Sequence, residues 1–223
     1  MNITRYFIVI IVSIGIGFFG LRFYDNFSES SDLNTFLEEA YVISTLHNES
    51  SKDYQRLINF DELNRDEFES TFIEIIRNAQ EANKNILKYQ DKNPSSLGMG
   101  TTMTAISIDS YALMKIGHVG DSRCYVLSDR NLIKVTEDQN VPGYQNVLKQ
   151  ALGSNEKLNI QEVDFQLQIG DVVFLCSDGL YNEVGEEYIK KKMQDGISAD
   201  TFVSEVLLLN PKDNVSAIVI NVV

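Results

Sequence analysis

Val172-Val173-Phe174-Leu175-Cys176-Ser177-Asp178-Gly179-Leu180 is the most informative string in this chain, because it carries a carboxylate out of a buried strand. The residues before Ser177 are apolar without interruption, which is typical of a strand in the interior of a protein. Gly179 follows the acid at once and allows a tight turn with close approach of backbone and water. We therefore expect Asp178 to stand at the edge of a sheet.

Two further acids repeat this pattern. Asp121 lies in Gly120-Asp121-Ser122-Arg123 after a strand-like segment, and Asp213-Asn214 precedes the closing strand expected at 215–222. Carboxylates at strand ends are the preferred ligands of hard cations such as Mg²⁺ and Mn²⁺. A single Asp-Gly or Asp-Asn is usually only a turn. Three in order, each beside a hydrophobic strand, predict one oxygen-rich metal site made by Asp121, Asp178 and Asp213.

Composition limits the classes of protein to consider. The 223 residues suffice for one ordinary domain with a short extension, and the 43% hydrophobic content suffices for a sizeable core. A formal net charge of −13 excludes nucleic acid as an expected partner, since phosphates would be repelled. Cysteine and histidine show no zinc-ligand spacing. We interpret Cys124, Cys176, His47 and His118 as structural residues.

The N-terminal run Tyr6–Leu21 holds only apolar residues, glycines and one serine, and it supports two interpretations. As a membrane anchor it would be an uncleaved single-pass helix, with residues 6–24 in contact with the bilayer. As a strand, Tyr6–Val12 would lead into a glycine turn, and the protein would be cytoplasmic. In both cases we expect a hydrophobic segment at 1–30 and the folded domain at 31–223.

Beyond this segment the hydrophobic period predicts helices first and mainly strands afterwards. Helices are expected over 31–47 and from Asn64 to Asp91, with Pro94 as a stop signal. Strands are expected at 103–108, 112–119, 123–127, 132–135, 163–167, 172–177 and 215–222, and further helices at 146–152, 186–193 and 201–208. The layout is α+β, with helices gathered against antiparallel sheet.

Five short motifs follow one another in the second half of the chain. They are Gly98-Met99-Gly100-Thr101-Thr102, Val119-Gly120-Asp121-Ser122-Arg123, Gln150-Ala151-Leu152-Gly153, the segment 170–180, and Asp213-Asn214-Val215-Ser216. In this order and spacing the chain resembles the bacterial form of the metal-dependent PP2C (PPM) family of protein phosphatases. The resemblance runs from about Asn64 to the C-terminus. It implies a β-sandwich of two antiparallel sheets flanked by helices, and hydrolysis of phosphoserine and phosphothreonine by metal-bound water.

The resemblance also implies roles for individual residues. Asp178 and Asp213 would hold the first metal, Mn²⁺ or Mg²⁺, and Asp121 would help to hold a weaker ion. Thr101 and Thr102 would brace the strand below the site. No residue other than the metal ligands is assigned to catalysis.

The chain departs from the family near its N-terminus. It has no counterpart of the family's first strand, which carries a glutamate and a phosphate-contacting arginine. If Val12–Phe18 is aligned with the next motif, Ile14 replaces the aspartate that bridges both metals, and on the anchor interpretation that strand is absent. Isoleucine has no lone pair to offer, so we expect one ion rather than a dinuclear site, in a sandwich with its first strands lost or altered. Asp138-Gln139 stands where the family usually has Asp-His, and we assign it no chemistry.

Three functions therefore remain open. The first is a phosphatase that acts on phosphoproteins, impaired by loss of the bridging acid or completed by a second chain. The second is a non-catalytic pseudophosphatase that binds a protein partner as a membrane-tethered regulatory module. In the third, the acids are only turn residues of an unrelated binding sandwich.

Overall fold

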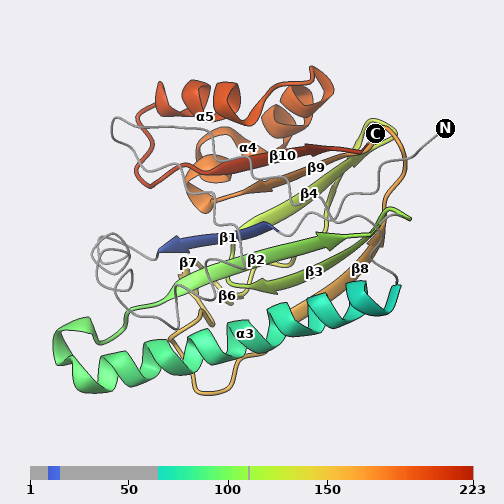
Figure 1. Cartoon of the computed structure of the whole chain (residues 1–223). Coiled ribbons are helices and arrows are strands. Elements are labelled where there is room, and N and C mark those ends of the chain that lie inside the picture. Colours follow the sequence, from blue (N-terminus) through green and yellow to red (C-terminus); the bar gives the residue numbers. More distant parts are fainter. Residues whose placement is uncertain (1–9, 16–64, 110, 223) are drawn as a thin grey trace.

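Two antiparallel sheets face each other between helices in a computed structural model of the chain (Figure 1). The structure describes residues 10–15, 65–109 and 111–222. Sheet A has the strand order β1-β2-β3-β8, and sheet B has the order β10-β9-β4-β5. A separate hairpin pairs β6 with β7. The arrangement is the α+β sandwich that the sequence predicts.

The strands are short and begin and end close to the predicted positions. Sheet A consists of β1 (Ile10–Gly15), β2 (Thr101–Ile108), β3 (Leu113–Val119) and β8 (Gln161–Gln166). Sheet B consists of β4 (Arg123–Ser128), β5 (Asn131–Lys134), β9 (Val172–Cys176) and β10 (Ala217–Asn221). The hairpin consists of β6 (Asn140–Val141) and β7 (Tyr144–Leu148).

Strand β9 shows why its sequence is apolar at every position. Val173 and Leu175 belong to the core between the sheets, which also contains Ile106 of sheet A. Phe174 and Cys176 belong to a second core, on the other face of sheet B. Successive side chains of a strand point to opposite faces. Because both faces of β9 are covered, neither alternate set of side chains can be polar without a cost.

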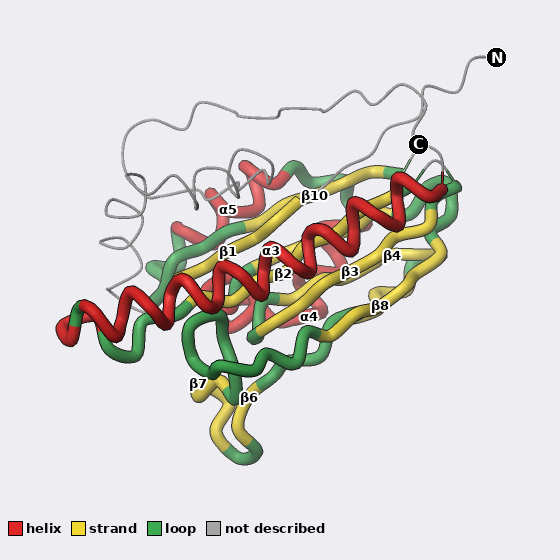
Figure 2. Tube along the Cα trace, turned by 60° about the horizontal axis from the view of Figure 1, so that its bottom comes forward, coloured by secondary structure: helices red, strands yellow, loops and turns green. Residues whose placement is uncertain are grey.

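Helices cover the outer faces of both sheets. They are α3 (Arg65–Lys92), the 3-10 turn η1 (Pro94–Ser96), α4 (Asp178–Gln194) and α5 (Ala199–Leu207). Helix α3 runs along sheet A (Figure 2), where Ala79 and Ile86 pack in one cluster with Met103 of β2. Helices α4 and α5 cover sheet B, and Phe202 of α5 stacks on Phe174 with ring centroids 5.0 Å apart. Helix α3 ends at Lys92, which confirms the helix predicted to end before Pro94.

One predicted element is wrong. The sequence predicts a helix over 146–152, but Tyr144–Leu148 is a strand that pairs with Asn140–Val141. The turn between them holds Gly143 at a φ of 82°, which glycine adopts without steric cost. This turn folds the segment back on itself, so local strand pairing replaces the expected helix.

The N-terminal run is described only at Ile10–Gly15, which forms β1. This strand pairs antiparallel with β2 and sets Ile14 opposite Thr102. The middle of the run is therefore a strand, and the helix required by the anchor interpretation does not pass through it. The predicted helix over 31–47 and the boundary near residue 30 lie outside the described residues. In the described ranges, none of the helices combines the length and apolar character needed to cross a bilayer.

Strand register brings several strand ends to one end of the sandwich. On sheet B, Cys176 at the end of β9 pairs with Arg123 at the start of β4 and with Ala217 at the start of β10. On sheet A, the end of β3 pairs with the beginning of β2. The connection from β3 to β4 crosses between the sheets at this same end. Asp121 and Asp213 lie in loops beside these strand ends, and Asp178 is the first residue of α4.

Candidate metal centre

Asp178 and Asp213 are held close together by Ser177, the buried residue that follows β9. The Ser177 Oγ donates a hydrogen bond to the carbonyl oxygen of Asn214 at 3.1 Å and accepts one from the amide of Ser216 at 2.9 Å. The Ser177 amide also donates to the Ser216 carbonyl at 3.1 Å. These three bonds dock the loop that carries Asp213 on the residue that immediately precedes Asp178.

Gly179 makes this close docking sterically possible. A Cβ at this position would clash with the carbonyl oxygen of Asn214, so only glycine fits without movement of the loop. Each acid also accepts a bond from the next residue along the chain. The Oδ1 of Asp178 accepts from the Gly179 amide at 2.9 Å, and the Oδ1 of Asp213 accepts from the Asn214 amide at 2.7 Å. The local backbone thus restrains both carboxylates.

Asp121 lies in the tight turn that joins β3 to β4. Gly120 adopts a φ of 109°, and a Cβ there would clash with the side chain of Thr102. The hydroxyls of Thr102 and Ser122 lie 2.8 Å apart and share a hydrogen bond. Gln139 closes the turn from the other side. Its side-chain Oε1 accepts a hydrogen bond from the backbone amide of Gly120, and its backbone amide donates one to the Gly120 carbonyl, both at 2.8 Å.

The three acids act on one another electrostatically. Burial is the main cause that raises the pKa of Asp121, followed by the charges of Asp178 and Asp138, and together they bring it to about 6. Burial also raises the pKa of Asp178, and the charge of Asp213 raises it further. A nearby like charge disfavours the ionised form. Asp178 is thus the acid that interacts with both of the others.

The chemistry of these carboxylates would suit one hard divalent cation. Carboxylate oxygens are the ligands that Mn²⁺ and Mg²⁺ prefer, and a cation would relieve the repulsion among these acids. Asp121 and Asp178 are half-buried and Asp213 is exposed, so water can complete the coordination. Among the residues that the structure describes, no three carboxylate, imidazole or thiolate groups converge closely enough to hold an ion unaided.

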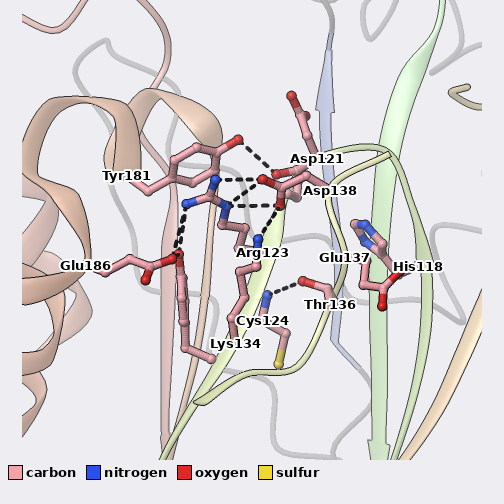
Figure 3. A network of polar contacts seen from close by, with 12 residues as sticks. His118, Asp121, Arg123, Cys124, Lys134, Thr136, Glu137, Asp138, Tyr181 and Glu186 are labelled. Carbon is pink, nitrogen blue, oxygen red and sulfur yellow. Dashed lines mark hydrogen bonds and ion pairs between the residues drawn. The ribbon is translucent and has the colours of Figure 1, made fainter. Parts of the chain in front are cut away.

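Arg123, the first residue of β4, is engaged by the protein itself (Figure 3). Its Nε and Nη2 donate to the carboxylate of Asp138 at 3.0 and 2.6 Å, and its Nη1 donates to the hydroxyl of Tyr125 at 3.0 Å. The Nη1 also lies 3.6 Å from the Oε1 of Glu186. The guanidinium carbon lies 3.5 Å from the centroid of the Tyr181 ring. Burial lowers the pKa of Arg123, but the bond to Asp138 and the bond to Tyr125 outweigh it and raise the pKa overall.

The end of sheet A beside this site is neutral. His118 is buried, and its Nε2 lies 3.0 Å from the carbonyl oxygen of Gly120. A carbonyl can only accept, so Nε2 carries the proton and Nδ1 accepts from the hydroxyl of Thr104 at 2.8 Å. Burial lowers the pKa of His118 to about 4, and the carbonyl bonds offset this only in part. Next to β2, strand β1 brings Ile14 opposite Thr102.

The sequence of residues 33–210 matches the family described as Protein phosphatase 2C. The chain belongs to the protein phosphatase 2C family. The match includes Asp121 and Asp178 and ends three residues before Asp213. The PP2C resemblance inferred from the five motifs is thereby confirmed, and it extends further toward the N-terminus than those motifs do.

Named relatives of this PP2C chain are bacterial. It is 31% identical over 162 residues to the serine/threonine phosphatase stp of Listeria monocytogenes, which is 63% of this chain and 64% of that protein. It is 31% identical over 160 residues to the serine/threonine protein phosphatase PstP of Mycobacterium tuberculosis, which is 63% of this chain and 31% of that protein. The matched region thus spans less than two thirds of the length of these relatives.

Solved structures share the same PP2C sandwich. The Mycobacterium tuberculosis serine/threonine phosphatase PstP/Ppp matches with a TM-score of 0.68 and 20% identity over 98% of this chain and 91% of that chain. The S. agalactiae serine/threonine phosphatase matches with a TM-score of 0.68 and 18% identity over 97% of this chain and 88% of that chain. At these identities the likeness establishes the fold, which the sequence predicts correctly.

Sequence reasoning missed the residues that support the PP2C acids. Asp138 and Gln139 were given no chemistry, yet Asp138 holds Arg123 and Gln139 closes the turn of Asp121. Tyr181 was missed as well, although its hydroxyl donates to the backbone carbonyl of Asp121 at 3.1 Å. The available signal was that Asp138-Gln139 stands where the family usually has Asp-His. This position marks the pair as part of the motif series, but it does not predict the contacts of Asp138 with Arg123 or of Gln139 with Gly120.

Proposed function

We propose that this chain is a PP2C-type phosphatase domain that hydrolyses phosphoserine and phosphothreonine in proteins with one divalent ion, Mn²⁺ or Mg²⁺. The observation that supports the proposal is the electrostatic coupling of the acids, because burial and the charge of Asp178 raise the pKa of Asp121, and burial and the charge of Asp213 raise the pKa of Asp178. The names of the relatives, which are serine/threonine phosphatases, support the same class of substrate. The net charge of −13 disfavours nucleic acid.

In this proposal Asp178 and Asp213 hold the ion, and Asp121 is a weaker ligand. A bound divalent ion supplies polarisation of a phosphoryl oxygen and a lowered pKa for a coordinated water. The protein contributes position, because Ser177 and Gly179 fix the loop of Asp213 against the start of α4. Hydrolysis adds water to phosphorus, breaks the bond from phosphorus to the serine or threonine oxygen, and returns a proton to that oxygen.

Turnover is expected to be slow relative to a complete PP2C centre. The aligned position of the bridging aspartate holds Ile14, which supplies no ligand. Arg123 is not expected to replace the family's phosphate-contacting arginine, because its Nε, Nη1 and Nη2 each donate to Asp138 or Tyr125. Loss of one group that stabilises developing charge typically costs about a hundredfold to a thousandfold in rate.

The test is hydrolysis of p-nitrophenyl phosphate and of a phosphothreonine peptide by the full chain, with and without Mn²⁺. We expect slow, Mn²⁺-dependent turnover that Asp178→Asn abolishes, because the amide removes the charge that holds the ion. Asp195→Asn, at the other end of α4, is the matched control and should leave turnover unchanged. Equal activity of the wild type and Asp178→Asn would exclude this site.

A non-catalytic binding module is the second candidate, and the identity of residue 14 favours it. Strand β1 pairs with β2, and if Val12–Phe18 is aligned with the family motif, Ile14 takes the place of the bridging aspartate. Such a domain would bind one Mn²⁺ and no second ion, and would hydrolyse neither substrate. Calorimetric titration with Mn²⁺ beside the hydrolysis assay separates the candidates, because binding without turnover is expected only for the module.

A further inference from the structure

Tyr181 joins two parts of the candidate metal centre that come from different regions of the chain. Tyr181 is buried, and its hydroxyl donates a hydrogen bond of 3.1 Å to the backbone carbonyl of Asp121. Tyr181 also lies in the first turn of α4, three residues after Asp178. The bond therefore connects the turn that carries one acid with the helix that begins at another.

Arg123 holds the Tyr181 ring in place from the other side (Figure 3). The guanidinium carbon lies 3.5 Å from the ring centroid, which is the geometry of a stacked cation–π contact. Three hydrogen bonds to Asp138, from Nε and Nη2, fix the plane of the guanidinium, and Glu186 beyond the kink of α4 adds a charge contact at 3.6 Å. The ring is thus clamped while its hydroxyl faces the Asp121 turn.

We propose that Tyr181 and Arg123 form a positioning pair that sets Asp121 relative to Asp178 and thereby the affinity of this centre for a divalent cation. The inference rests on the proposed metal-dependent function and adds two residues to it. Neither residue is a ligand in this proposal. Outer residues that orient ligands commonly alter metal affinity by about tenfold to a hundredfold when they are changed.

The bonding capacity of each group supports this role. Asp138 takes three hydrogen bonds from Arg123, whose side chain is only 17% exposed. The Nη1 donates to Tyr125, whose own hydroxyl donates to Glu186 at 3.0 Å. The Nε, Nη1 and Nη2 of Arg123 therefore each donate within the protein, and the Tyr181 ring stacks on the guanidinium. Arg123 thus contributes to the metal centre by supporting the Tyr181 ring, and its positive charge also acts on Asp121.

The experiment is calorimetric titration of the full chain with Mn²⁺ in Tyr181→Phe and in Tyr188→Phe. Both substitutions remove one hydroxyl from α4, but the Tyr188 hydroxyl bonds Glu205 at 2.7 Å on α5, and Tyr188 is not among the residues that contact the three acids. We expect the Mn²⁺ dissociation constant to rise about tenfold in Tyr181→Phe and to stay unchanged in Tyr188→Phe. Metal-free melting temperatures, measured in parallel, should fall by similar amounts in the two variants.

Arg123→Lys provides the second arm, because lysine keeps the charge but loses the planar, two-pronged contact. If the two residues act as one device, Tyr181→Phe and Arg123→Lys together should weaken Mn²⁺ binding less than the product of their separate effects. Unchanged Mn²⁺ affinity in Tyr181→Phe, with intact wild-type binding, would overturn the positioning role alone. Failure of the wild type to bind Mn²⁺ would overturn both the positioning role and the proposed function.

Discussion

The ends of sheets A and B at the candidate metal centre differ in chemistry, although they lie side by side. Sheet B ends beside Asp178 and Asp213, which are charged and reach solvent in part. Near the same end of sheet A, Thr104 of β2 and His118 of β3 are neutral, buried and bonded to each other, with Ile14 on the adjoining strand β1. Both sheets nevertheless pack on one apolar core. The sandwich is thus stabilised by apolar burial, and acids are not required at both ends for it to fold.

The largest effect is expected when an acid is added to the neutral side. Ile14→Asp should provide the bridging ligand that the aligned family motif contains, so calorimetry should show about two Mn²⁺ per chain instead of about one. Turnover of p-nitrophenyl phosphate should rise by about a hundredfold. Ile10→Asp, on the same strand but opposite Ile106, is the matched control and should not raise either quantity. An unchanged stoichiometry in Ile14→Asp would show that residue 14 is not the missing ligand position.

Acid should destabilise the neutral side through His118. Burial lowers the pKa of this imidazole to about 4, whereas the unfolded chain has the ordinary value of 6.5. Between these values the unfolded state binds more protons, so the free energy of unfolding falls as the pH falls from 6.5 to 4. At about 1.4 kcal/mol for each pKa unit, the loss should be about 3 kcal/mol.

His118→Gln isolates this contribution, because an amide can still accept from Thr104 and donate to the Gly120 carbonyl. Denaturant unfolding across this pH range should show a steeper loss of stability in the wild type than in the variant. Parallel curves for the two proteins would mean that His118 does not gain a proton on unfolding.

The smallest effect concerns the spacing of the acids on the charged side. Gly179→Ala places a Cβ against the Asn214 carbonyl, which should cost about 1–3 kcal/mol of unfolding free energy and move the loop of Asp213 away from Asp178. Mn²⁺ affinity should fall as well. Gly143→Ala, in the exposed turn of the hairpin, has only backbone strain to overcome and should leave Mn²⁺ affinity unchanged. Equal Mn²⁺ affinity in both variants would show that Gly179 does not set this spacing.

Several elements could be predicted because their signals are local. Helix α3 carries its apolar residues at the helical period, and Ala79 and Ile86 are buried as this period requires. Strand β9 is apolar at every position and ends where Asp178 follows. The order of the motifs was also sufficient to name the family. The placement of the acids at strand ends followed from the same local patterns.

Other features could not be predicted, because they depend on contacts between distant segments. Nothing near Tyr181 in the sequence indicates that its hydroxyl bonds the carbonyl of Asp121, 60 residues earlier. The sequence of β7 overlaps the helix predicted over 146–152, and its apolar content suits either structure. Pairing with β6 around Gly143 favours the hairpin. The strand at Ile10–Gly15 is as apolar as a membrane anchor, and only its pairing with β2 distinguishes the two.

The amino-acid sequence alone was enough to predict the family, the order of the buried elements and the three acids. Each motif behind these predictions consists of side chains within a few residues of one another. The neutral state of His118, the engagement of Arg123 and the closeness of Asp178 to Asp213 came from the folded chain. These properties arise from burial and from hydrogen bonds across the two sheets. Both causes exist only once distant strands have packed, because desolvation and pairing depend on which groups become neighbours.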